Sequence, residues 1–223
     1  MFALTPIEIL HDSSLPFVQE FPLCSQQQTK TMTYSQTGKR IFDILLSLCL
    51  LGLLAPLLLV IACISYCEYP SYKHILFIQS RVGLHGQLFR MFKFRSMLVD
   101  ADQQGPYYTS KNDPRITRWG RFLRKTSLDE LPQLLNVLKG EMSLVGPRPN
   151  LPIQRQFYSD DEWALRCAVR PGITGLAQAT LRSQATLEQG KYCDLQYAKK
   201  PSFWFDVKIL LLTINQVLRT GSY

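Results

Sequence analysis

An acidic pair, Asp129-Glu130, directly follows a stretch rich in basic residues, and this juxtaposition points to chemistry on phosphate. Cations beside carboxylates at the start of a helix can serve a phosphate anion and a divalent metal together. One carboxylate there can attack phosphorus as a nucleophile while its neighbour holds Mg²⁺. The basic residues that lead into the pair are Lys111, Arg115, Arg118, Arg121, Arg124 and Lys125.

A structural interpretation of the same residues stays open. Ser127 and Glu130 have the spacing of a capping box, in which each side chain satisfies the other's backbone donor, and Asp129 would then favour the helix dipole. The basic series would then be a solvated face or a patch for lipid headgroups. A second acidic group, at residues 160–162, has capping-box spacing from Ser159 and the wrong spacing for a metal site, so we expect it only to start a helix.

Local patterns predict the elements that must position these residues. Two apolar segments, 75–78 and 88–94, flank a turn at Gly83 and Gly86 and predict a β-hairpin. Helices are expected over residues 113–125, 127–139, 159–168 and 202–219, the first of them capped by Asp113 with Pro114 in its first turn. The last is strongly apolar and suits a mixture of core and membrane-interface packing. The fold class is therefore α+β and mostly helical.

An apolar run over residues 41–64 is long enough to cross a bilayer, because 24 helical residues span about 36 Å. A single-pass helix is the simple interpretation. Pro56 interrupts the run, however, and basic residues flank both of its ends, which favours a bent helix that enters and leaves by the same face. Asp43 lies close to Lys39 and Arg40, so we expect it to stay at the headgroups in either arrangement.

Charge is unevenly distributed along the 223 residues, whose formal net charge is +8. Residues 1–72 hold three basic and five acidic residues, whereas the rest of the chain holds 22 basic and 12 acidic ones. A basic domain beside a membrane segment suggests anionic partners: phosphate-rich substrates, lipid headgroups or nucleic acid. The rival hypothesis is a non-enzymatic single-pass anchor with a basic surface for anionic lipid or nucleic acid. The aromatic-basic pattern of nucleic-acid modules is missing, so we expect no nucleic-acid partner.

The chain resembles the bacterial polyprenyl-phosphate sugar-1-phosphate transferases, the monotopic phosphoglycosyl transferases. The resemblance begins at Lys39-Arg40-x-x-Asp43, before the apolar run with its central proline, and covers roughly residues 39–219. Further blocks follow in order and at the family's spacing: QSRVGLHG at 79–86, FKFRSM at 92–97, NDPRITR at 112–118, SLDELPQLLNVLKG at 127–140, SLVGPRP at 143–149 and RPGITG at 170–175.

The resemblance implies a reaction and roles. Asp129 would be the nucleophile and Glu130 its Mg²⁺-binding partner, with Asp129 also near the metal, and Mn²⁺ is an alternative ion. A UDP-sugar would lose UMP to leave an aspartyl-phosphosugar, which polyprenyl (undecaprenyl) phosphate then accepts. This would be the first membrane step of exopolysaccharide, lipopolysaccharide O-antigen or glycoprotein glycan synthesis. Phosphate binding falls to Lys93, Arg95, Arg124 and Arg148, and the nucleotide-sugar region to Arg170, Pro171, Gly172, Thr174, Gly175 and Gln178.

The implied organisation is a flexible tail (1–38), a re-entrant membrane helix bent at Pro56 (39–68) and a cytoplasmic catalytic domain (69–223) with membrane-surface helices around the active site. It would lie on the cytoplasmic face of a bacterial inner membrane, in contact with lipids, and a homodimer is left open. Two departures from the family stand out. Ala55 replaces the usual serine before the proline, and residues 176–182 replace a tryptophan and an asparagine-glycine-arginine stretch, so the sugar is undetermined. Because it lacks the extra amino-terminal helices of longer relatives, we expect a minimal form.

Overall fold

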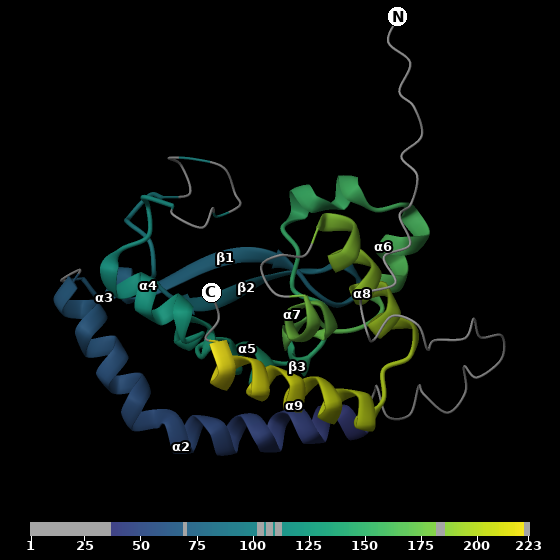
Figure 1. Cartoon of the computed structure of the whole chain (residues 1–223), viewed down its shortest axis with the longest axis horizontal. Coiled ribbons are helices and arrows are strands. Elements are labelled where there is room, and N and C mark those ends of the chain that lie inside the picture. The colour runs from purple at the N-terminus through teal and green to yellow at the C-terminus, as the bar shows by residue number, and fades with distance from the viewer. Residues whose placement is uncertain are drawn as a thin grey trace, which may run out of the picture.

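A computed structural model of the chain describes residues 37–68, 71–101, 105, 109, 113–181 and 186–220. These residues form a mostly helical α+β fold with two small two-stranded sheets, which confirms the predicted class (Figure 1). Nearly all of the expected amino-terminal tail, and Lys111 of the basic series, lie outside the described residues. The elements are α2 (Lys39–Glu68), α3 (Tyr72–Ile75), β1 (Leu76–Val82), η2 (Leu84–Gly86), β2 (Leu88–Phe94), α4 (Arg118–Lys125), η3 (Leu128–Glu130), α5 (Gln133–Lys139), β3 (Ser143–Val145), η4 (Pro152–Phe157), α6 (Asp160–Cys167), β4 (Gly172–Thr174), α7 (Leu176–Thr180), α8 (Leu187–Lys199) and α9 (Phe203–Thr220).

The predicted hairpin is confirmed. Strands β1 and β2 pair antiparallel, with Leu76 opposite Phe94 and Val82 opposite Leu88. Gly86 takes a left-handed backbone conformation in the turn, with φ at 78°, which a side chain would disfavour. Helix α5 is fastened to β2 through Asn136, whose amide accepts from the Phe92 backbone N–H at 3.0 Å and donates to the Arg90 carbonyl at 2.7 Å.

A second sheet pairs β3 with β4 in parallel, and the sequence patterns did not predict it. The two backbones approach so closely that a Cβ on Gly172 would lie 2.1 Å from the Gly146 nitrogen. Glycine is therefore required at this crossing, where no side chain could be accommodated. The large core cluster surrounds this sheet and includes Val137, Leu144, Val145, Tyr197 and Ile209.

The beginning of α2 is docked against the domain formed by the later elements. Lys39 forms a buried ion pair with Asp206 of α9, and Arg40 donates to the backbone carbonyls of Val137 and Leu138 at the end of α5. The carboxylate of Asp43 accepts the backbone N–H of Leu144 at 3.1 Å and is buried. Strand β3 thus supplies a backbone donor that binds this carboxylate inside the protein, a partner that the sequence analysis did not predict.

The far end of α2 contacts the same domain. Ser65 accepts the indole N–H of Trp119 in α4 at 3.1 Å, and Ile61 is buried in a small core cluster with Phe94 and Leu123. Between these ends α2 contains Pro56, and its direction changes along its length in Figure 1. A proline removes one helical hydrogen bond, which gives the bend a physical cause.

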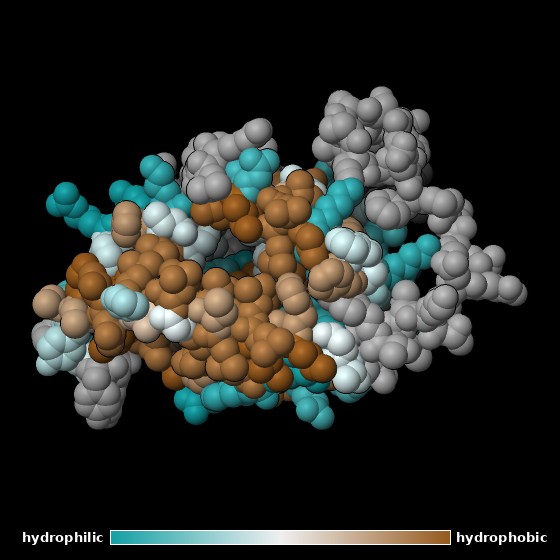
Figure 2. Space-filling view, turned by 90° about the horizontal axis from the view of Figure 1, so that it is seen from below, coloured by the Kyte–Doolittle hydropathy of each residue, from teal (hydrophilic) through white to brown (hydrophobic). Residues whose placement is uncertain are grey.

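The middle of α2 is apolar and largely uncovered. Among the described residues it is the one helix long and apolar enough to cross a membrane, with a mean hydropathy of 2.9 in a window of which 11% is buried. Figure 2 shows the apolar side chains gathered over one face of the molecule. Exposed members of this face belong to α2 and α9 and include Leu45, Leu53, Leu59, Val60, Trp204, Leu211 and Ile214.

The predicted helix start at Asp113 was wrong. Helix α4 begins at Arg118, where Thr117 caps it by accepting the Gly120 N–H at 2.9 Å. Asp113 caps no helix, because its carboxylate binds the backbone N–H and the guanidinium of Arg115 at 2.7–3.0 Å. The expected helices at 159–168 and 202–219 are confirmed as α6 and α9, and Ser159 and Glu162 form the predicted capping box.

Candidate active site

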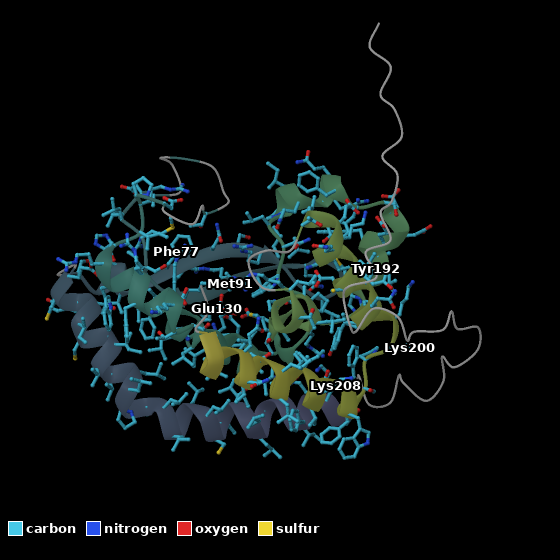
Figure 3. The ribbon with its side chains drawn as sticks, viewed as in Figure 1. Phe77, Met91, Glu130, Tyr192, Lys200 and Lys208 are labelled. Atoms are coloured by element: carbon cyan, nitrogen blue, oxygen red, sulfur yellow. The ribbon has the colours of Figure 1, made fainter. Side chains whose placement is uncertain are left out.

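A cavity of about 1150 Å³ opens between the hairpin, the α4–η3 segment, the β3–β4 sheet and α9. One part of its lining is charged and the other is apolar, with Leu50 from α2 and Leu210 and Val217 from α9. In the view of Figure 3 the labels of Glu130 and Met91 both fall within the body of the molecule. The charged part of the lining contains Arg81, Lys93, Arg95, Arg124, Asp129, Glu130 and Arg148.

The acidic pair is placed by an unusual backbone turn at the end of α4. Ser127 has a left-handed conformation, with φ at 58°, and the short helix η3 follows it. The Ser127 side chain makes no capping hydrogen bond, so the predicted capping box and the continuous helix over 127–139 were wrong. Pro132 separates η3 from α5, since a proline lacks the backbone N–H that a continuing helix needs. The pair thereby occupies a tight corner that faces the cavity.

Glu130 is held by two cations. Its Oε1 accepts from Lys93 Nζ at 2.7 Å and from Arg148 Nη2 at 2.9 Å. Burial opposes ionisation of this carboxyl, but attraction to Arg148 and Lys93 outweighs it and holds the pKa of Glu130 at about 2. Burial also lowers the pKa of Lys93, against the attraction of Glu130. Glu130 is thus a carboxylate whose charge the protein has already compensated.

Asp129 is in a different electrostatic position from its neighbour. Asp129 is 6% exposed, and this burial raises the pKa of its carboxyl. The attraction of Lys93 lowers the pKa, whereas the negative charge of Glu130 raises it further. Two adjacent carboxyls whose environments push their pKa values in opposite directions are typical of groups with different roles. Asp129 is the more basic of the two, and it faces the cavity.

The remaining predicted phosphate-binding residues line the same cavity. Arg124 Nε donates to the Ser96 hydroxyl at 2.8 Å, and Arg95 Nε donates to the His74 carbonyl at 3.0 Å. These contacts fix each side chain through one of its nitrogens. Arg115 also lines the cavity, but its guanidinium binds the Asp113 carboxylate and the Ala101 carbonyl.

The predicted nucleotide-sugar residues are divided between two places. Thr174 and Gln178 line the cavity, and the Thr174 hydroxyl lies 2.7 Å from that of Thr213 on α9. Arg170 does not line it, because its Nε donates to the Gly140 carbonyl at 2.9 Å. The other three lie at the close backbone crossing of β3 and β4: Pro171, Gly172 and Gly175.

Arg81 and Gln79 are cavity residues for which the sequence analysis predicted no role. The side-chain oxygen of Gln79 accepts from Arg81 at 2.6 Å and 3.0 Å, and Arg81 Nη1 donates to the Pro149 carbonyl at 3.0 Å. Burial and repulsion from Arg148 lower the pKa of Arg81 to about 10, so it stays charged at neutral pH. Their spacing of two on a strand, which places both side chains on one face, was the available signal.

The donor set fits Mg²⁺ only as a partial site. No cluster of three or more histidine, cysteine, aspartate or glutamate side chains occurs among the described residues. Asp129 and Glu130 offer carboxylate oxygens, and one oxygen of Glu130 is already engaged by Lys93 and Arg148. Mg²⁺ is commonly bound by one or two carboxylates together with substrate phosphates and water. The pair therefore suits an ion that arrives with a phosphate substrate.

Comparison with known proteins gives a family. The model of the bacterial sugar transferase family matches residues 34–220. The chain belongs to this family. The undecaprenyl-phosphate glucose phosphotransferase of Komagataeibacter xylinus is 40% identical over 222 residues, which cover 95% of this chain and 40% of that relative.

Other relatives differ in length and in the sugar that they are named for. The UDP-glucose:undecaprenyl-phosphate glucose-1-phosphate transferase of Caulobacter vibrioides is 42% identical over 82% of this chain and 71% of its own length. The undecaprenyl-phosphate galactose phosphotransferase of Salmonella typhimurium is 39% identical over 95% of this chain and 47% of its own length. The chain thus spans less than half the length of several relatives, two of which are named for different sugars.

Proposed function

We propose that this chain transfers a sugar-1-phosphate from a UDP-sugar to polyprenyl phosphate, with release of UMP, through a covalent intermediate on Asp129. The observation that carries the proposal is the pairing of two carboxylates in one cavity: Asp129 is buried, and the charge of Glu130 is compensated by Lys93 and Arg148. The same cavity extends from these charged residues to Leu50 of α2. Family membership supports it, as do the relatives that are named for transfer to undecaprenyl phosphate.

In the first half-reaction a carboxylate oxygen of Asp129 attacks the phosphorus bonded to the sugar. A bond forms between Asp129 and that phosphorus, the bond to the bridging oxygen breaks, and UMP leaves with the electron pair. The burial that raises the pKa of Asp129 also makes its carboxylate a better nucleophile once it is ionised. Glu130, ionised and paired, stays a charge rather than competing as a second nucleophile.

Phosphoryl transfer depends mainly on positioning and on compensation of charge. Lys93 and Arg148 at Glu130, together with Arg95 and Arg124, supply cations around the cavity in which a diphosphate would bind. Mg²⁺, or Mn²⁺ in its place, would be held by Asp129 and Glu130 and would offset the charge that develops on the diphosphate.

In the second half-reaction a phosphate oxygen of the lipid attacks the same phosphorus, and the bond to Asp129 breaks to restore the carboxylate. The acceptor carries a long isoprenoid chain, which must stay in an apolar surrounding while its phosphate reaches Asp129. Leu50, Leu210 and Val217 give the cavity an apolar side formed by the membrane helix and α9. This side supports entry of the acceptor directly from the bilayer.

The proposed placement is on the cytoplasmic face of a bacterial inner membrane, with α2 entering and leaving by the same leaflet. Lys39 and Asp43 at one end of α2, and Ser65 near the other, all bind the same catalytic domain. The binding of both ends to one domain supports a helix that leaves the bilayer by the side from which it entered. UDP-sugars are cytoplasmic, so this placement brings the donor and the lipid acceptor together.

The experiment that tests the function is UMP release by the purified protein with polyprenyl phosphate and a panel of UDP-sugars. We expect release with at least one UDP-sugar, and transfer of radiolabelled sugar phosphate into the lipid fraction. A non-enzymatic membrane anchor with a basic surface would bind vesicles of anionic lipid but release no UMP from any member of the panel. That rival gives the paired carboxylates no role. The pathway supplied would be glycoconjugate synthesis, at its first membrane step.

A further inference from the structure

We propose that Arg166 and Asp194, which lie outside the cavity, position Arg148 for the reaction. The inference rests on the proposed function, since it assigns a supporting role at that site. Neither residue lines the cavity, and neither belongs to the blocks that resemble the transferase family. Arg166 and Asp194 are connected to the site through the backbone of the segment that carries Arg148.

The segment is fastened at successive carbonyl groups. The Pro147 carbonyl accepts from the Gly172 N–H at 2.9 Å, and the Asn150 carbonyl accepts from the Val82 N–H at 2.9 Å. Arg81 donates to the Pro149 carbonyl from the hairpin side. The carbonyl of Arg148 itself accepts from Arg166 Nη2. Of these anchors, Arg166 is the one that binds the residue whose side chain reaches Glu130.

Arg166 is itself held in one orientation. Its Nε and Nη2 donate to Asp194 Oδ2 at 3.1 Å and 2.9 Å, and Nη2 also lies 3.1 Å from the Asn150 side-chain oxygen. Both members of the pair are buried, at 3% and 7% exposure. Its guanidinium also lies over the ring of Tyr158 at 5.6 Å. A buried, multiply bonded guanidinium has little freedom, so it fixes the groups that it binds.

Arg148 combines a fixed backbone with an exposed side chain. About half of that side chain is accessible, yet its Nη2 lies 2.9 Å from Glu130 Oε1. A long exposed arginine has many rotamers, and the position of its backbone decides how many of them reach Glu130. Misplacement of a catalytic group by about 1 Å can lower a rate by about a hundredfold. Arg166 therefore acts on the reaction through Arg148 and not by contact with substrate.

The main test replaces the whole ion pair with apolar residues, in the variant Arg166→Met/Asp194→Leu. Removing only Arg166 would leave a buried, uncompensated carboxylate, whereas replacing both partners is often neutral for stability. We expect a melting temperature close to that of the wild type and a loss of about tenfold or more in kcat/KM for UMP release. A variant with unchanged kcat/KM would overturn the proposal.

A double-mutant cycle separates positioning from general stability. Once Arg148→Met has removed the guanidinium, adding Arg166→Met/Asp194→Leu should lower kcat/KM by less than about twofold. Equal losses in both backgrounds would show that the pair does not act through Arg148 and would overturn the proposal. The control is Lys191→Met on α8, which contacts the same Tyr158 ring and Glu162 of α6 but not the Arg148 segment. Its kcat/KM should stay within about twofold of the wild type.

Hydrogen–deuterium exchange gives a readout that does not need turnover. We expect faster exchange at the Val82 and Gly172 amides, which bind the Asn150 and Pro147 carbonyls, in the pair-replaced variant and not in Lys191→Met. Unchanged exchange there would overturn the positioning role. Absence of UMP release by the wild-type protein would instead overturn the proposed function, and the exchange result would still decide whether the pair holds this segment. The two failures are therefore distinguishable.

Discussion

Trp119 donates its indole N–H to the hydroxyl of Ser65 at 3.1 Å, and so fastens α4 to the later part of α2. Lys39 and Asp43 fasten the beginning of the same helix. These contacts predict that residues before α2 lie on the same side of the membrane as the active site. A spanning helix would place them on the opposite side.

The topology can be measured with a single cysteine introduced as Ser35→Cys in a variant without the native cysteines. We expect this thiol to be protected from a membrane-impermeant reagent in intact cells and to be labelled after permeabilisation. A cysteine at the exposed residue Asp160 of α6 reports in the same assay the side of the membrane on which the cavity lies. Labelling of the Ser35→Cys variant in intact cells would contradict re-entry and favour a single-pass helix.

We predict that Asp129→Asn lowers turnover by about 10³-fold or more while the protein keeps its fold. Asparagine preserves the shape of aspartate but is a poor nucleophile on phosphorus. The matched control is Asp160→Asn in α6, whose carboxylate is 96% exposed and lies outside the cavity. Activity should be measured as UMP release and folding as the melting temperature. Near-normal turnover in a sequence-verified Asp129→Asn protein would exclude the nucleophile assignment.

We predict that activity requires Mg²⁺ or Mn²⁺ and that Glu130→Gln raises the required metal concentration by about tenfold or more. The substitution removes one carboxylate from the proposed metal pair and leaves Lys93 and Arg148 without their shared anion. Metal titrations of UMP release measure the effect, with Glu162→Gln in the α6 capping box as a control of equal charge change. Full wild-type activity in excess chelator would refute the metal requirement.

Two helical glycines give opposite predictions for the same substitution. A Cβ on Gly120 of α4 would lie 1.9 Å from the Ser96 carbonyl oxygen, whereas a Cβ on Gly190 of α8 would meet nothing within 4 Å. Gly190→Ala should therefore stabilise the protein by up to about 1 kcal/mol, since alanine favours a helix. Gly120→Ala should destabilise it by about 1–3 kcal/mol, because the clash is with backbone. Chemical or thermal unfolding measures both changes.

Cys193 should be unreactive at moderately alkaline pH. Burial and the charge of Asp194 raise the pKa of its thiol to about 11, so the reactive thiolate is scarce at pH 8. In single-cysteine variants, a maleimide should label exposed Cys67 much faster than Cys193 at this pH. Equal labelling rates at pH 8 would contradict this prediction.

The same shift in the pKa of Cys193 makes stability depend on pH. An unfolded thiol ionises near pH 8.5. The free energy of unfolding should therefore fall as the pH rises from about 8.5 towards 11.

Local signals in the sequence predicted those parts of the fold that local contacts decide. The hairpin followed from two apolar segments around a glycine turn, and α6 followed from Ser159 and Glu162, whose side chains do cap each other. The strands β3 and β4 were beyond such reasoning. Each has three residues, too few for an alternating pattern, and their pairing joins segments that lie almost 30 residues apart.

The errors around the site have identifiable physical origins. Ser127 has the sequence spacing of a helix start, but its left-handed backbone instead ends α4 and turns the chain into η3. Asp43 has a partner, the Leu144 amide, that only the tertiary fold supplies. Asp113 instead binds the guanidinium of Arg115, two residues along the chain, and so is not available to cap a helix. The proposed catalytic pair could be identified because its chemistry is contiguous in sequence. The role of Gln79 and Arg81 at the cavity needed the structure.

Because α2 is docked on the rest of the fold, the lipid that surrounds α2 would affect the stability of the whole fold. A chain that began after Glu68 would leave Asp206 without the Lys39 cation and the Leu144 amide without its acceptor. It would also expose the part of the core that Phe42, Leu46 and Leu50 cover. Lipid around α2 would stabilise the folded arrangement by mass action if it solvates the bent, docked helix better than the undocked one. Delipidation in detergent should therefore weaken the geometry around Asp129 itself, and lipid composition should tune the enzyme through its folding equilibrium.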